Sequence, residues 1–239
     1  DGKKGVEDPG SPIYLDENII SQPAAALQLV AKEIFRMSDQ VRDILKKTIE
    51  LVKNEEVKSI DGLKENGEQV ERLGKCITEY LAALFSSGSL TEQQAAQTAS
   101  LMCVLSDVER MGTLSVEMAE CMLERSDRKY KYTPEAMDEL QKSLKVLNKM
   151  FCDSLKALQG DDGIEPGKMM KRKDKLLDLD IKMRKAHIER VNKGKCKASL
   201  TAPFTNILHL IDRMGNSCIN LADVAESGTS MKYFMLEEK

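Results

Sequence analysis

The sequence predicts an all-α protein built as two tandem antiparallel three-helix bundles. The first reason is composition: thirteen Met, six Pro and 31% charged residues, with only 4% aromatic residues, favour helices over strands. The second is spacing, because apolar residues recur every three or four positions over long stretches. The third is repetition, because a pattern within 101–123 returns 103 residues later within 208–226.

The repeated stretch combines a packing stripe with a polar motif. The motif reads Glu-Arg-Met-Gly-Thr at 109–113 and Asp-Arg-Met-Gly-Asn at 212–216. Packing alone does not require an acid followed by Arg-Met-Gly. We therefore expect a tandem duplication, with any functional residues of each copy at this motif. The stripe residues are Leu105, Val108, Gly112, Ser115, Ala119 and Met122, matched by Leu208, Ile211, Gly215, Cys218, Ala222 and Ala225.

Composition also limits the class of protein. A chain of 239 residues allows one large domain or two smaller ones, and a net charge of −3 gives no global signal for nucleic acid. Six Cys stand far apart without a C-x-x-C pair, which predicts reduced, buried thiols and argues against a zinc site. No signal peptide is visible, and no apolar run reaches the roughly 18 to 20 residues of a membrane-spanning helix.

The first bundle is expected over 23–127, after a polar linker or arm at 1–22 that has apolar residues able to dock. Pro23 suits the first turn of a helix, where its missing N–H is not needed. Thr91 and Gln94 form a capping-box signature for the third helix. The three helices are expected over about 23–53, 55–85 and 91–126.

The second bundle is expected over 132–228. Thr133 before Pro134 is an N-terminal helix signal, and the apolar positions after it repeat the first helix at an offset of 110. The fifth and sixth helices are expected over about 165–192 and 199–228. The apolar positions of the fifth helix include Leu177, Ile181, Ile188 and Val191. Residues 229–239 form a short apolar tail that can cover one end of a bundle.

Carboxylates are the candidate ligands. Asp174 and Asp178 lie four residues apart, on one face of the fifth helix, where they can meet Asp212 and Asn216 in an antiparallel hairpin. Such an all-oxygen set suits Mg²⁺ or Ca²⁺, or Mn and Fe with added water. At an offset of 107 the first copy offers Glu71, together with Glu109 on the third helix. The ordinary alternative is that these acids are solvated or paired with a neighbouring Arg or Lys.

Nothing in the sequence points to catalysis. A ferritin-type di-iron centre uses Glu-x-x-His, whereas His187 follows Arg184 and His209 follows Asn206. No nucleophile–base motif or glycine-rich phosphate loop is present. We therefore expect no enzyme, and we place His209 on the surface.

A basic stretch is the other candidate surface. Residues 168–197 hold twelve Lys and Arg against four acids, a local balance of +8. A solvated helix face is the ordinary explanation. The functional one is a surface for anionic lipid headgroups or for an acidic partner. Nucleic acid is not expected, because few aromatic residues are interleaved for stacking.

Paired repeats with acid-Arg-Met-Gly-polar on the third helix resemble the PhoU family over about residues 14–228. In that family the motif usually ends in a second acid and is paired with an Asp-x-x-x-Asp-like motif on the preceding helix. The opening IYLDENIISQPAAALQLVAKEIFRMSD is similar, more narrowly, to the start of the PhoU-like domain of bacterial sodium/phosphate cotransporters.

The resemblance implies a non-enzymatic regulator of phosphate uptake or signalling with metal-binding carboxylates, often for iron. Carried over by position, the second-repeat set is Asp174, Asp178 and Asp212, with Asn216 in place of an acid. The first-repeat set is Gly67, Glu71, Glu109 and Thr113, of which two lack a carboxylate. A divalent metal or iron is therefore expected at the second repeat rather than the first.

The resulting expectation is the cytoplasmic domain of a sodium-dependent phosphate cotransporter, at the inner face of the cell membrane, with a membrane-spanning part before residue 1. Its partners would be the transporter segment or a phosphate-signalling protein, and residues 168–197 would face an anionic membrane. No nucleic acid is expected as a partner. The chain could also form a homodimer. The alternatives are a free-standing PhoU-type regulator and a carboxylate metal-binding helical protein.

Overall fold

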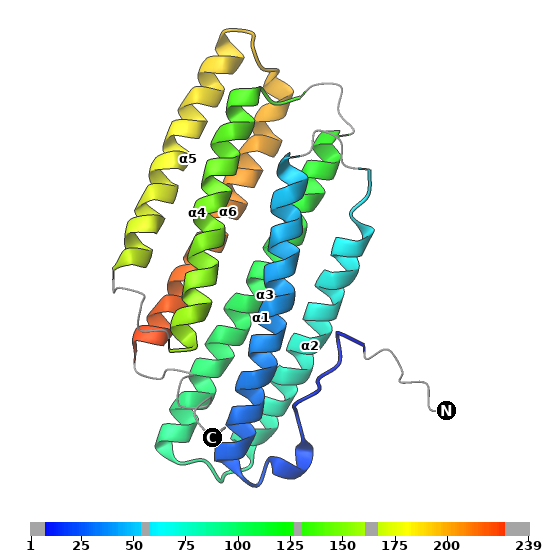
Figure 1. Cartoon of the computed structure of the whole chain (residues 1–239), viewed down its shortest axis with the longest axis vertical. Helices are drawn as coiled ribbons and strands as arrows, with labels where there is room; N and C mark the ends of the chain where they lie inside the picture. The colour runs from blue at the N-terminus through cyan, green and yellow to red at the C-terminus, as the bar shows by residue number, and fades with distance from the viewer. Residues whose placement is uncertain (1–7, 54–57, 127–130, 161–166, 228–239) are drawn as a thin grey trace.

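The structure, a computed structural model, describes residues 8–53, 58–126, 131–160 and 167–227. The described residues form helices and no strands, which confirms the all-α prediction (Figure 1). No helix among them is both long and apolar enough to cross a bilayer. The helices are α1 Pro23–Lys53, α2 Asp61–Ser86, α3 Glu92–Ser126, α4 Pro134–Leu158, α5 Lys168–Asn192 and α6 Thr201–Glu226, with 3₁₀ turns η1 Glu17–Ile19 and η2 Ala198–Leu200.

The six helices form two three-helix groups that lie side by side. Helices α1–α3 pack together, as do α4–α6, and the groups meet where α3 packs on α6 and α1 on α4 (Figure 1). The buried apolar residues of both groups belong to one continuous core. The division into two domains at 23–127 and 132–228 stays a prediction. The predicted tail at 229–239 lies outside the described residues, as do 1–7 of the predicted arm.

Burial confirms the duplication for two pairs of helices. Every residue that α6 buries has a buried counterpart in α3, 103 positions earlier. Nine of the ten residues that α4 buries have a buried counterpart in α1, 110 positions earlier. Both offsets agree with the sequence pattern, because the same face of each repeated helix is turned toward the core.

For α5 the predicted register is wrong by one residue. This helix buries Met169, Leu176, Met183 and His187, which follow the buried Leu63, Val70, Ile77 and Leu81 of α2 by 106 positions rather than 107. The predicted apolar positions Leu177, Ile181 and Ile188 are exposed instead. The helix carries two apolar stripes next to each other, and the periodic pattern alone does not show which one faces the core.

Capping side chains set two of the helix starts. The Thr133 hydroxyl accepts from the Ala136 N–H at 3.3 Å. At α3 the capping box forms as predicted: Thr91 Oγ1 accepts from the Gln94 N–H at 3.2 Å, and Gln94 Oε1 accepts from the Thr91 N–H at 3.0 Å.

Two helices start later than the sequence predicts. Helix α2 begins at Asp61 rather than at about 55, because the Ser59 hydroxyl accepts from the Asp61 N–H at 3.1 Å and fixes the turn there. Helix α5 begins at Lys168, after Gly167 with a φ of 78° that suits glycine. The predicted starts at about 55 and 165 themselves lie outside the described residues, because 54–57 and 161–166 are not described.

The segment before α1 is docked onto the body rather than extended away from it. Its anchor is the fully buried Glu33 of α1, whose carboxylate accepts the N–H groups of Ile13 at 2.9 Å and Tyr14 at 2.7 Å. Arg36 pairs with the same carboxylate at 2.5 Å. From α2, the Tyr80 hydroxyl donates to the carbonyl of Asp16 at 2.8 Å. This part of the arm is therefore held by both α1 and α2.

Candidate functional site

The repeated polar motif lies where the third helix of each repeat faces the second. In the first repeat, Glu109 of α3 is half-buried against Gly74 of α2. A Cβ at position 74 would lie 3.2 Å from the carboxyl carbon of Glu109. Glycine costs a helix interior about 1 kcal/mol relative to alanine, and here its missing side chain leaves the space that Glu109 occupies.

The two candidate carboxylates of the first repeat are close enough to interact. Burial raises the pKa of Glu109, and the negative charge of Glu71 raises this pKa further. A carboxylate that is partly desolvated and faces another carboxylate favours a bound proton or cation. The charge of Glu71 therefore acts on Glu109, and a shared site for the two carboxylates stays a prediction.

A groove of about 280 Å³ opens between α2 and α3, with Glu71 but not Glu109 in its wall. Gly67 and Thr113, the two positions where the family resemblance expects acids, both line it. Of the four glutamates in its wall, Glu120 is paired with Lys64 at 2.9 Å. The groove is lined by Lys64, Gly67, Glu68, Glu71, Thr113, Val116, Glu117 and Glu120.

The second repeat differs, because Lys173 of α5 stands where the first repeat has Gly67, 106 residues earlier. The ammonium of Lys173 donates to the carboxylate of Asp212 and also to its backbone carbonyl at 3.2 Å. Lys173 also lies beside Gly215, where a Cβ would meet its Nζ at 3.4 Å. Asp212 therefore has a cation supplied by α5 itself.

The other predicted ligands of the second repeat point elsewhere. Asp178 is exposed and pairs with Lys182 at 2.6 Å, the ordinary (i, i+4) alternative for such an acid. Asp174 and Asn216 are exposed as well. The expected convergence on Asp212 does not occur, because the 106-residue register turns Lys173 rather than Asp174 toward α6.

Within the described ranges, no group of three or more His, Cys, Asp and Glu side chains is arranged to hold a metal ion. The second-repeat set does not fit a cation as it stands, because Lys173 already neutralises Asp212. The first repeat offers Glu71 in the wall of an open groove and the half-buried Glu109 on the neighbouring helix. Metal binding itself stays a prediction.

The histidines have structural surroundings. His187 is buried and stacks on Phe204 with ring centroids 4.7 Å apart, and its Nε2 lies 3.0 Å from the Thr201 hydroxyl. Burial lowers the pKa of His187, and the charge of Arg190 lowers it further. His209 is exposed, as predicted. All six cysteines are free thiols, but only Cys196 and Cys218 are buried as predicted; the other four are half-buried or exposed, namely Cys76, Cys121, Cys152 and Cys103.

Two important residues were missed from the sequence. Glu33 lies in the buried stripe of α1 between Val30 and Met37, and an acid in a core stripe is itself a signal that polar partners must be found nearby. Lys173 gave no such signal, because lysines surround it in the sequence.

The fold and the motif define an all-helical protein that repeats a three-helix unit. Residues 34–122, from within α1 to near the end of α3, match the model of the PhoU domain family. The chain is also 24% identical over 209 residues to a protein of Thermotoga maritima named phosphate-specific transport system accessory protein PhoU homolog 1. That similarity covers 86% of this chain and 88% of the relative, and so it extends over both repeats.

Proposed function

We propose that this chain is a non-catalytic regulatory module of a phosphate transport system. The observation that carries the proposal is the similarity to an accessory protein of phosphate-specific transport over 86% of the chain.

Two arrangements of this module are open. In a free-standing regulator, the chain would act on a separate transporter or phosphate-signalling protein; the relative, of which 88% is covered, supports this version. In a sodium/phosphate cotransporter, it would be a cytoplasmic domain at the inner membrane face; the resemblance of its opening segment supports that version. The size and membrane fraction of the native protein on an immunoblot separate the two, because this chain alone has a mass of 26.7 kDa.

The regulatory proposal is tested by phosphate uptake in cells of the native host. Deleting the gene is expected to abolish the difference in radioactive phosphate uptake between phosphate-rich and phosphate-starved cells. A plasmid copy of the native gene should restore that difference, and an empty plasmid should not. Unchanged regulation in the deletion strain would show that the chain does not control phosphate transport.

A cation in the first-repeat groove is a second candidate function. It is supported by the raised pKa of the half-buried Glu109, which the negative charge of Glu71 increases, and by the open groove that Glu71 lines, since a bound cation would offset this repulsion. Elemental analysis after purification without chelator, and calorimetric titration with Mn²⁺, are the tests. Glu109→Gln is expected to remove Mn²⁺ binding, whereas Asp178→Ala should not. If Asp178→Ala removed Mn²⁺ binding and Glu109→Gln did not, the result would instead support the metal site predicted for the second repeat.

A further inference from the structure

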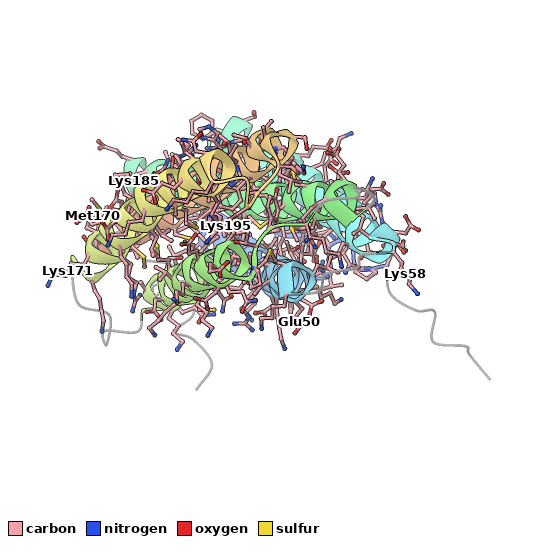
Figure 2. All side chains as sticks on the ribbon, turned by 90° about the horizontal axis from the view of Figure 1, so that it is seen from above. Glu50, Lys58, Met170, Lys171, Lys185 and Lys195 are labelled. Carbon is pink, nitrogen blue, oxygen red and sulfur yellow. The ribbon has the colours of Figure 1, made fainter. Side chains whose placement is uncertain are left out.

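The outer face of α5 carries a second apolar stripe. Met170, Leu177, Ile181 and Ile188 are 51%, 52%, 57% and 56% exposed, and they make up most of the exposed large apolar side chains of the described residues. They are separated by seven, four and seven residues, a spacing that places them along one line of a helix. Figure 2 shows Met170 at the outer edge of the molecule.

This stripe is not required by the fold of the single chain. The inner face of α5 already buries Met169, Leu176, Met183 and His187 against α4 and α6. Four exposed large apolar side chains along one line of a helix are uncommon on a monomer, and such a surface often binds a partner.

The charges beside the stripe are mainly positive. Lys171, Lys175 and Lys185 are exposed, and none has an ion pair within the described part of the chain. Two of the neighbouring acids are already neutralised: Asp178 pairs with Lys182 at 2.6 Å and Asp180 pairs with Arg184 at 2.7 Å. Over its full length α5 has nine Lys and Arg against four acids, in a protein of net charge −3.

We infer that this face, defined by the apolar stripe and its flanking lysines, binds an amphipathic helix of another protein. The partner helix would have an apolar seam at the same seven-residue repeat and carboxylates along its flanks. The spacing supports a helical partner, because residues alternating by four and three form the seam of helix pairs packed knobs into holes. The free lysines supply the charge to which acidic flanks are complementary.

Two other occupants fit the face less well. Asp174 lies on the same line as the stripe, four residues after Met170 and three before Leu177. Arg184, three residues after Ile181, lies on this line as well and pairs with Asp180. A bilayer would have to accept both charges beside its hydrocarbon, whereas polar residues in a helix seam fix the register. A second copy of α5 packed antiparallel would bring its lysines against the same lysines, which repel.

The test uses a synthetic helical peptide of the length of α5, with Leu and Ile at seam positions and Glu on both flanks. Binding of the labelled peptide to the full chain is measured by fluorescence anisotropy. A peptide with Lys in place of Glu is the control. Vesicles of phosphatidylglycerol and phosphatidylcholine are the probe for a lipid surface.

The acidic peptide is expected to bind, and Ile181→Asp should weaken this binding by at least about tenfold, as for a residue at the centre of an interface. The double variant Lys171→Glu, Lys185→Glu should weaken it several-fold, with a smaller effect at high salt. The matched controls are Phe85→Asp, since Phe85 is also 57% exposed, and Lys58→Glu. Figure 2 shows Lys58 at the opposite edge of the molecule from Lys171.

Three results would overturn the inference. The acidic peptide does not bind, or Phe85→Asp weakens peptide binding as much as Ile181→Asp does, or the vesicles bind and the peptide does not. Self-association of the chain that Ile181→Asp abolishes would assign the face to a second copy instead. These outcomes do not depend on the proposed role in phosphate transport, because neither the peptide nor the vesicles involve phosphate uptake.

Discussion

Glu33 places a carboxylate in the core of the first three-helix group, and its energetic role can be measured. Glu33→Ala leaves the N–H groups of Ile13 and Tyr14 and the guanidinium of Arg36 without their acceptor. We expect a loss of about 3 kcal/mol in the free energy of unfolding in urea, since bonds to a buried charge are expensive to leave unmade. Limited proteolysis should also cut the arm more quickly.

The control for Glu33 lies on the same helix. Glu50→Ala removes an exposed carboxylate, and we expect a change within about 0.5 kcal/mol. Glu33→Gln keeps one acceptor oxygen and should fall between the two. Equal stability of Glu33→Ala and Glu50→Ala would show that the arm is not held by this carboxylate.

Glu109 is expected to lower stability at neutral pH. Its pKa is raised in the folded state, so that ionising it above that pKa costs folding free energy. Glu109→Gln should therefore stabilise the protein at pH about 7 by less than about 1 kcal/mol, because water still reaches the carboxylate. The gain should disappear as the pH falls below the unfolded value of about 4.3. Urea unfolding across this range checks the sign, with exposed Glu124→Gln as control.

His187 is expected to make the protein sensitive to mild acid. Its pKa is lowered in the folded state, so the unfolded chain takes up the proton first as the pH falls. Stability should be complete above the unfolded value of about 6.5 and decline below it. His187→Gln should flatten the change in thermal midpoint across this window, whereas His209→Gln at an exposed position should not. The same slope in both variants would assign the effect to other groups.

Helix starts provide a test at the scale of the element. Thr133→Ala removes the acceptor for the Ala136 N–H at the first turn of α4, and we expect a loss of about 1 kcal/mol. Thr113→Ala is the matched control in the middle of α3, where Thr113 is exposed. There the change should be neutral or slightly stabilising, because alanine is the better helix former. Chemical denaturation of both variants and of Thr133→Ser measures the difference.

The helices were predictable because their signals are local. The start of α1 at Pro23, the box at Thr91 and the cap at Thr133 depend on residues within one turn, and all three form. The offsets of 103 and 110 were also visible, because α3 and α6, like α1 and α4, each bury one dominant stripe.

The candidate site was less predictable because it depends on the rotation of one helix about its axis. Helix α5 has apolar pairs such as Met169 with Met170 and Leu176 with Leu177, so two faces compete for the core. If the face with Leu177 were buried, Asp174 would be turned toward α6. Packing of Leu176 turns Lys173 there instead, where it meets Asp212. The contacts of α4 and α6 make this choice, and they are not local in sequence.

At the scale of the whole molecule, the two repeats are joined by contacts between α3 and α6, the corresponding third helices of the two repeats. The Asn220 amide of α6 donates to the carboxylate of Asp107 on α3 at 3.2 Å. Ser115 of α3 lies 3.7 Å from the sulfur of Met214. Together with the continuous apolar core, these contacts tie the stability of each repeat to that of the other.

We therefore expect one cooperative unfolding transition for the whole chain, because separating the repeats would expose the apolar faces of α3 and α6 to water. Leu81→Ala in the first repeat and Leu147→Ala in the second remove fully buried side chains. Each should cost about 2–5 kcal/mol and lower the midpoint of the same calorimetric transition. Leu177→Ala on the exposed face of α5 should leave it nearly unchanged. Two separate transitions, each lowered by only one of the core variants, would show that the repeats fold as independent domains.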